Sequence, residues 1–366
     1  MPENPVRSLL DRLRSDLTEK EHTDQVLSDG KTRTFPIRAE NFIEISGTIN
    51  PKKIAFVDGG DGILEESPNY MIVINRLYFS IFRGKKRIMP QKLKRRIEFF
   101  SYVVSEIKKV GERQSISYNT NLFTYDDGDL EYLPDVADLT SKVEYSSILQ
   151  GSKLVSLSRR FAEWNMACRI VENELSSGDV IVIDGSLQTS FENEVKYANR
   201  LYELATEKGV IVCGLTKTSR LVTQSGDPLL ARIAEISERT DLPRWYIPVA
   251  EKVSSDDRGF MVVCKLHPKS RHVFRFEILL EQFNAMGEDE RNNVLASLAV
   301  NAEDISMLGY PYGSIDADRF AQVRINELEM YRGMIMAEKS RDPQWKRLSK
   351  YTLTNVVHDD LNWVTS

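Results

Sequence analysis

Two aspartates that follow buried apolar runs are the residues best placed to do chemistry. Asp58 ends the apolar run in "KKIAFVDGGDG", and Asp184 ends the run in "DVIVIDGSLQTS". The runs lack polar alternation, which is typical of central strands covered on both faces. Glycine follows each acid, so we expect the chain to turn there and leave the carboxylate accessible. Functional sites of open α/β sheets lie beyond such strand ends.

A divalent metal site is the chemistry that these acids predict. If the two strands are neighbours, the carboxylates lie close together and repel, so one takes a proton or a cation lies between them. A hard cation with oxygen ligands, Mg²⁺ or Mn²⁺, meets this need. Glu163 is the best candidate for a third acid, because it lies on the helix predicted before the Asp184 strand, on the face near Arg159 and Arg160. Each acid alone is also consistent with a surface or turn position.

Alternating strand and helix patterns position these acids. We predict strands at "NYMIVINRLYFSIF" and "VIVCGLTKTSR", an antiparallel pair at "GFMVVCKLH" and "HVFRFEILL", and helices from Ser156 to Gly178 and over residues 192–207. The order strand, helix, strand implies parallel pairing with helices on the sheet faces. The phrase "MLGYPYGSIDADRFAQVRINELEMYRGMIMAEK" predicts a turn and one long helix.

The N-terminal segment and the composition indicate the class of protein. Residues 1–30 carry leucines at helical spacing, which predicts an amphipathic helix packed on the core or on a partner chain. The leucines are Leu9, Leu10, Leu13 and Leu17. At 366 residues, with 41% hydrophobic and 28% charged residues, the chain is typical of a soluble globular protein. It has no apolar run of roughly 20 residues and no signal peptide, so we expect it in the cytoplasm without a membrane partner. Three widely spaced cysteines predict buried reduced thiols. They are Cys168, Cys213 and Cys264.

A basic stretch is the candidate surface for nucleic acid. The net charge is −5, so such binding needs a local positive patch. "FRGKKRIMPQKLKRRIEFF", residues 82–100, concentrates lysine and arginine and includes Lys85, Lys86 and Arg87. It is equally consistent with phosphate contact and with a solvated loop and helix face. The mixed region that follows, to about residue 150, is predicted to be an insertion without a core of its own.

Several reaction classes are excluded by residue type. The sequence contains no GxxxxGK[ST] loop for nucleotide phosphates, no GxSxG elbow and no HExxH zinc motif. "VDGGDG" faintly resembles the Asp-x-Asp of aspartyl-phosphate phosphatases, which leaves a phosphatase with Asp58 as nucleophile as a minor alternative.

Five motifs in order resemble the NurA nuclease family: "FVDGG", "RRFAEWNMA", "VIVIDGSL", "LTKTSRL" and "LGYPYGSIDADRFAQV". The resemblance covers roughly residues 40–335. That family acts in DNA double-strand break repair beside a hexameric HerA-type translocase. The resemblance implies an α/β fold of RNase H-like type, a mixed sheet flanked by helices. It divides the chain into an N-terminal helical segment 1–40, a nuclease domain 41–338 with an insertion at about 83–150, and a tail 339–366.

The resemblance also implies a set of metal ligands. Asp58 matches the first-strand ligand, Glu163 the helix acid of an R-x-x-E motif, and Asp184 the second strand-end ligand. The closing family motif is Gly-Tyr-Pro followed by a helix with Ala-His, whereas this helix reads "DADRFA". Asp318 therefore stands where histidine is expected, and aspartate can also bind a divalent metal.

The fourth ligand position has other candidates, and the reaction implies further contacts. Asp316 or His267 could complete the site in place of Asp318. The implied reaction is hydrolysis of a DNA phosphodiester by two metal ions bridged by Asp58. Lys217, just beyond a predicted strand, would contact a phosphate with Arg220 behind it. Arg159 and Arg160 are further candidate DNA contacts.

The family implies activities and partners that the residues themselves do not specify. They are 5′ to 3′ exonuclease activity on single- and double-stranded DNA, single-strand endonuclease activity, and a homodimer with a central DNA channel docked on the translocase ring. A different class of function is also open, a non-catalytic DNA-binding adapter of a translocase with a degenerate site. The missing histidine and the net negative charge lend that alternative some weight.

Overall fold

The computed structural model describes residues 4–348 apart from 19–22, 28–31, 49, 111–112, 145–150, 253 and 255. The strands are β1 (Thr32–Thr34), β2 (Ile43–Glu44), β3 (Lys53–Ser67), β4 (Tyr70–Arg83), β5 (Lys86–Ile88), β6 (Arg96–Val110), β7 (Arg113–Thr124), β8 (Ser141–Glu144), β9 (Val180–Asp184), β10 (Ile211–Thr216), β11 (Trp245–Lys252), β12 (Gly259–Lys265) and β13 (Phe274–Leu279). The α-helices are α1 (Pro5–Thr18), α2 (Gly151–Asn173), α3 (Glu194–Lys208), α4 (Leu229–Ser237), α5 (Leu280–Ala285), α6 (Glu288–Asn301), α7 (Tyr312–Ala321), α8 (Ile325–Arg341) and α9 (Pro343–Leu348).

One mixed sheet organises the described residues. It has 13 strands, with the main path β1-β11-β12-β13-β10-β9-β3-β4-β6-β7-β8. β9 is parallel to both β3 and β10, and the other strand pairs are antiparallel. The predicted class, a mixed sheet flanked by helices, is therefore confirmed.

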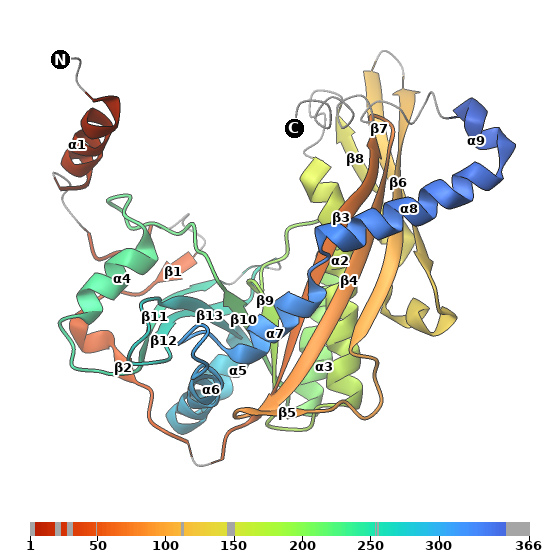
Figure 1. Ribbon diagram of the computed structural model, residues 1–366. Helices are drawn as coiled ribbons and strands as arrows, with labels where there is room; N and C mark the ends of the chain where they lie inside the picture. Colours follow the sequence, from red (N-terminus) through yellow and green to blue (C-terminus); the bar gives the residue numbers. More distant parts are fainter. Residues whose placement is uncertain are drawn as a thin grey trace.

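Helices cover both faces of the central strands (Figure 1). On one face, α2 and α3 pack on alternate strand residues such as Val57 and Ile183. On the other face, α5, α6 and α7 pack on the intervening residues, such as Phe56 and Val182. A third cluster lies under α4, against β11 and β12. The near-continuous apolar runs of β3 and β9 follow from this double coverage.

The path of β3 differs from the sequence prediction. The strand does not turn at Asp58 but continues to Ser67, paired with β4 along its length. The glycines after Asp58 are needed for space. A Cβ at Gly60 would lie 2.3 Å from the Ala321 carbonyl oxygen at the end of α7, and one at Gly62 would lie 2.4 Å from a Leu328 methyl of α8. At the other aspartate the prediction is confirmed, since β9 ends at Asp184 and Gly185 has φ +108°.

The helix predicted after "GYPYG" is two helices, α7 and α8, with a break at residues 322–324. The break is fixed by Arg76 of β4, which is 2% exposed. Its guanidinium donates to the Gln322 carbonyl oxygen at 2.8 Å and pairs with Glu327 of α8 at 2.7 Å. The buried Arg76 therefore contacts both the end of α7 and the start of α8. Helical periodicity in the sequence cannot reveal this contact with a distant strand.

The basic stretch contains no helix. Residues 86–88 form β5, which turns back on β4, and residues from Arg96 enter β6. β6 and β7 extend the same sheet, so the region that we interpreted as an insertion continues the β-structure. Its long strands project beyond the helical layers, and α8 crosses them (Figure 1).

The N-terminal helix is shorter than predicted and does not pack on the core. α1 ends at Thr18, and all four leucines of its apolar stripe are between 51% and 66% exposed. Figure 1 shows α1 standing apart from the sheet. Within the segment expected to be helical, Thr32–Thr34 instead form β1, which pairs with β11. Among the described residues no helix is long and apolar enough to cross a membrane. The three cysteines are buried free thiols, as predicted.

Candidate metal centre

The parallel pairing of β3 and β9 brings the two strand aspartates together. Val57 is paired with Ile183, so Asp58 and Asp184 are the next neighbours along the two strands. Asp58 lies two residues after Phe56 and Asp184 two residues after Val182, so both face the side of the sheet that α7 covers. Asp58 is 7% exposed, and Asp184 is half-buried at the end of its strand.

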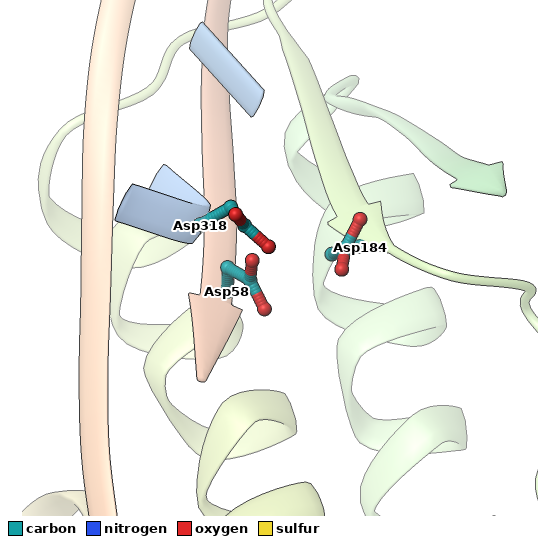
Figure 2. A group of neighbouring side chains, drawn as sticks. All are labelled: Asp58, Asp184 and Asp318. Carbon is teal, nitrogen blue, oxygen red and sulfur yellow. The ribbon is translucent and has the colours of Figure 1, made fainter. Parts of the chain in front are cut away.

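A third carboxylate comes from α7. Asp318 lies on the exposed side of this helix, one turn before the end that touches Gly60. The carboxylate oxygens of Asp58, Asp184 and Asp318 lie within 4.8 Å of one another. Figure 2 shows the three side chains directed toward one shared space, from β3, β9 and α7.

Lys217, just past β10, lies in the same group. Its ammonium donates to Asp318 Oδ1 at 2.6 Å and to Asp184 Oδ2 at 3.3 Å. A cation among these carboxylates reduces their mutual repulsion. The position that the sequence indicated for a phosphate contact is therefore also one where an ammonium neutralises the acids.

Crowded acids perturb one another. Burial, followed by the charges of Asp184 and Glu163, raises the pKa of Asp58 to about 8. Burial also raises the pKa of Asp184, and the charge of Lys217 opposes that rise. A bound cation would lower the pKa of such a carboxyl group, so the group would lose its proton and bind the cation as a carboxylate.

Glu163 reaches the site from the opposite face. It lies on α2, and its Oε1 would be 2.3 Å from a Cβ at Gly59, so the missing side chain there gives it access to β3. Its carboxylate pairs with the Arg159 guanidinium, which also donates to Asp61 Oδ2 at 2.6 Å. Burial raises the pKa of Glu163, whereas Arg159 lowers it. Glu163 is thus near Asp58 but outside the group of three carboxylates whose oxygens lie within 4.8 Å.

Arg160 holds the loop that follows Asp184. Its guanidinium donates to the carbonyl oxygens of Ser186 at 3.4 Å and Gln188 at 3.2 Å, and pairs with Glu194 at 2.7 Å. Glu194 is fully buried and accepts from the Ser190 amide at 2.6 Å. Arg159 and Arg160, predicted as DNA contacts, therefore have their guanidinium groups engaged inside the fold.

The other predicted site residues lie elsewhere. Asp316 is buried and pairs with Arg87 of β5, and the His267 ring accepts from the Lys269 amide at 3.1 Å, so neither joins the carboxylate group. Arg220 is exposed. Lys86 is also exposed, and the exposed Lys85 pairs with Glu303 at 2.6 Å. The DNA-binding roles of these basic residues stay predictions.

Three positioning residues were not among the site residues predicted from the sequence. Asp61 holds Arg159, Glu194 holds Arg160, and Glu277 of β13, 1% exposed, accepts from the Leu187 amide at 2.8 Å. The "DGGDG" phrase places Asp61 three residues after Asp58, which could have drawn attention to it. The two glutamates become informative only once the fold brings them to the loop after Asp184.

The donor set fits a divalent cation. Three carboxylates from three elements supply only hard oxygen ligands, which suit Mg²⁺ or Mn²⁺. Burial and the neighbouring charges of Asp184 and Glu163 raise the pKa of Asp58, and a bound cation would offset both effects. The arrangement can therefore hold a metal at the carboxyl end of β9, at the edge where α/β sheets place functional sites.

Comparisons with known proteins agree with this architecture. Residues 52–323 match the NurA domain family. The crystal structure of the NurA nuclease from Sulfolobus solfataricus is similar, with a TM-score of 0.54, 12% sequence identity, and coverage of 93% of this chain and 96% of that chain. An Argonaute from Aquifex aeolicus aligns with 76% of this chain and 29% of its own at 8% identity, but its TM-score of 0.27 is too low to inform the fold. No curated protein matches the sequence.

Proposed function

The chain belongs to the NurA family, and from that premise we propose that it is a metal-dependent DNA nuclease that hydrolyses phosphodiesters at the Asp58, Asp184 and Asp318 group. The observation that carries the proposal is the convergence of three carboxylates from separate elements within 4.8 Å. The alternative of a phosphatase is disfavoured, because the family is one of nucleases and Asp58 lies among other acids.

We assign the metal ligands to Asp58, Asp184 and Asp318, with Glu163 as the acid that completes the site from the α2 face. These residues would hold the divalent ions, Mn²⁺ or Mg²⁺, that the reaction needs. When bound, divalent ions lower the pKa of water and stabilise charge on the leaving oxygen of a phosphodiester. Asp318 takes the place of the family histidine as an oxygen ligand.

The remaining residues of the site have proposed roles in binding and positioning. Lys217 contacts a phosphate oxygen of the substrate once its ammonium leaves the carboxylates, and Arg220 is exposed nearby in sequence. Arg159 orients Glu163, and Arg160 holds the loop after Asp184, which assigns both a positioning role instead of direct DNA contact. The exposed cations of the β4–β5 turn, Lys85 and Lys86, are proposed contacts to more distant phosphates.

The wider biological role is proposed from the family. It includes 5′ to 3′ exonuclease and single-strand endonuclease activity in DNA end processing, a homodimer, and docking on a HerA-type translocase. The proposed domain division is an N-terminal segment 1–40, a nuclease domain 41–338 and a tail 339–366, of which residues 349–366 lie outside the described part of the chain.

Alanine substitution of the two strand aspartates tests the catalytic assignment. Asp58→Ala and Asp184→Ala should each lower Mn²⁺-dependent cleavage of linear single-stranded and double-stranded DNA by more than about 100-fold, since each removes a ligand of the ions that stabilise the transition state. Rates are measured on 5′-labelled oligonucleotides, and thermal unfolding verifies the fold of each variant.

Asp241→Ala is the matched control, because Asp241 is exposed and far in sequence from the site. It should cleave DNA at the rate of the unmodified protein. Unchanged cleavage by a folded Asp58→Ala protein would refute the assignment. If the unmodified protein binds DNA but no metal supports cleavage, the non-catalytic adapter is the better description.

A further inference from the structure

A cavity of about 700 Å³ lies next to the three carboxylates. Its lining includes Asp318, one of the three, and Lys217, which is hydrogen-bonded to Asp318. Its walls come from α4, the loop between β12 and β13, the loop after α6, and α7. Sites for small organic groups usually have volumes of about 300–1,000 Å³. Because the cavity borders the group proposed to act on the phosphodiester, an occupant of the cavity would lie next to that phosphate.

The lining of the cavity is largely apolar and partly aromatic. The rings of Phe274 and Tyr310, with centroids 5.0 Å apart, are almost fully buried and form the back of the cavity, and the accessible apolar surface comes from the exposed Met307 and the half-buried Ile315. Nucleobases bind through their faces to aromatic and apolar side chains with little preference for sequence. A sugar or a phosphate is polar, so without a base it would leave this apolar surface uncovered.

Cations are also present in the lining. Arg271 and His272 are exposed, and within the described chain neither side chain forms an ion pair. His272 lies beside Phe274, with ring centroids 6.4 Å apart. Lys217 supplies a third basic group at the boundary with the carboxylates. Basic groups next to an aromatic, apolar surface are the combination that binds single-stranded nucleic acid.

We propose that this cavity receives one unpaired nucleoside next to the phosphate that is cut, with its base on the apolar floor and the adjoining phosphate near Arg271. The inference rests on the proposed nuclease function and adds to it a subsite for one base. A base can enter such a cavity only when it is unstacked and unpaired. The site therefore acts on a single strand or on a frayed end, and a fully paired duplex must open there first.

An abasic-scanning experiment tests the cavity. A series of 5′-labelled oligo(dT) strands carries one abasic nucleotide, moved one position at a time, and affinity is measured by anisotropy with Ca²⁺ in place of Mn²⁺. One position should weaken binding by about tenfold, because the base that is missing there can no longer reach the apolar surface.

Ala231→Trp, which fills the cavity from α4, should bind intact DNA as weakly as that abasic strand and lose the position effect. Arg271→Ala is a second variant, which should weaken binding of every strand and reduce its salt dependence.

The control and the outcomes separate the two proposals. Ala337→Trp, the same change at an exposed site of α8, should keep the position effect, and thermal unfolding verifies each fold. If the unmodified protein cuts DNA with Mn²⁺ but no abasic position matters, the cavity proposal is wrong while the nuclease proposal stands. The same conclusion follows if Ala231→Trp keeps the position effect. If the unmodified protein neither binds nor cuts DNA, both proposals are wrong.

Discussion

At the scale of single residues, the position of Lys217 among the acids sets up a competition. Its ammonium lies 2.6 Å from Asp318 and 3.3 Å from Asp184, where it neutralises the same oxygens that a divalent ion would use. The ammonium side chain is 38% exposed, so water screens these pairs and each contributes at most about 1 kcal/mol. A divalent ion bound by these carboxylates would therefore compete with Lys217.

Replacing this lysine should change metal binding and catalysis in opposite directions. Lys217→Met should bind Mg²⁺ up to about fivefold more tightly at pH 9, above the raised pKa of Asp58, because the competing cation is gone. Its cleavage rate should fall, because the proposed phosphate contact is lost. Calorimetry measures the affinity, and Lys217→Arg, which keeps the charge, is the control. Weaker Mg²⁺ binding by the methionine variant would contradict the competition.

The raised pKa of Asp58 predicts a pH-dependent metal affinity. In the metal-free protein Asp58 holds its proton up to about pH 8, whereas a metal requires the carboxylate. The Kd for Mn²⁺ should therefore fall as pH rises from 6 to 8, by at most about tenfold per pH unit, and level off above 8. Calorimetry in buffers of different ionisation enthalpy should detect the released proton below pH 8. A Kd that is constant over this range would show that Asp58 is already ionised.

The raised pKa of Asp58 also predicts how the stability of the metal-free protein changes with pH. A carboxyl group whose folded pKa is raised stabilises the fold fully below its unfolded pKa, near 3.8, and that contribution is lost as pH rises through about 8. Asp58→Asn should remove this dependence, so the metal-free variant should gain in melting temperature relative to the unmodified protein as pH rises from 4 to 8.

The sequence identified some of these residues and not others, for physical reasons. Asp58 and Asp184 were predicted because an apolar run followed by aspartate and glycine can be recognised in the local sequence. The family motif indicated Asp318. The route by which Glu163 reaches β3 was not predictable, because it depends on the space left above Gly59. The role of Glu277 was equally hidden, since its partner, the Leu187 amide, is 90 residues away.

At the scale of elements, the glycines of β3 decide how closely α7 approaches the sheet. The end of α7 lies against Gly60, and Asp318 is on the last turn of that helix. Any side chain at this strand position moves the backbone that carries the third carboxylate. The spacing between strand and helix is thus a condition for the metal centre.

Gly60→Ala should disturb both stability and metal binding. The new Cβ would lie 2.3 Å from the Ala321 carbonyl oxygen, so α7 must shift, at a cost of about 1–3 kcal/mol in the free energy of unfolding. The Kd for Mn²⁺ should rise along with the loss of stability. Thermal unfolding and calorimetry measure the two effects. Gly47→Ala is the control, because no atom lies within 4 Å of a Cβ there, and an equal effect of both changes would show that the close approach is unimportant.

Element boundaries were predictable where the signal is local. The ends of α3 and β9 follow from Gly209 and Gly185, both with positive φ. The break between α7 and α8 was not predictable, because it requires Arg76 of β4 to reach Gln322. The strands of residues 96–124 were also missed, since their charged and polar residues suggested an irregular insertion while their stability comes from pairing with β4.

At the scale of the whole molecule, α1 is the part that the fold does not stabilise. Its leucines are more than half exposed, so truncating them removes no core contact. Replacing Leu9 and Leu13 by Gln should change the free energy of unfolding by less than about 0.5 kcal/mol per residue. Leu201→Ala, fully buried in α3, is the contrasting control and should cost about 2–5 kcal/mol. Chemical denaturation measures both, and a large loss for the α1 variant would mean that the helix packs on the protein or on a second copy.

The three acids are contributed by residues 58, 184 and 318, so most of the polypeptide separates the first from the last. During synthesis the N-terminal strands emerge from the ribosome long before α7 does. A nascent chain that has not reached residue 318 lacks one carboxylate and the helix end that seats against Gly60. If the three acids act together as proposed, the metal site is therefore incomplete until α7 has been synthesised and has packed against β3.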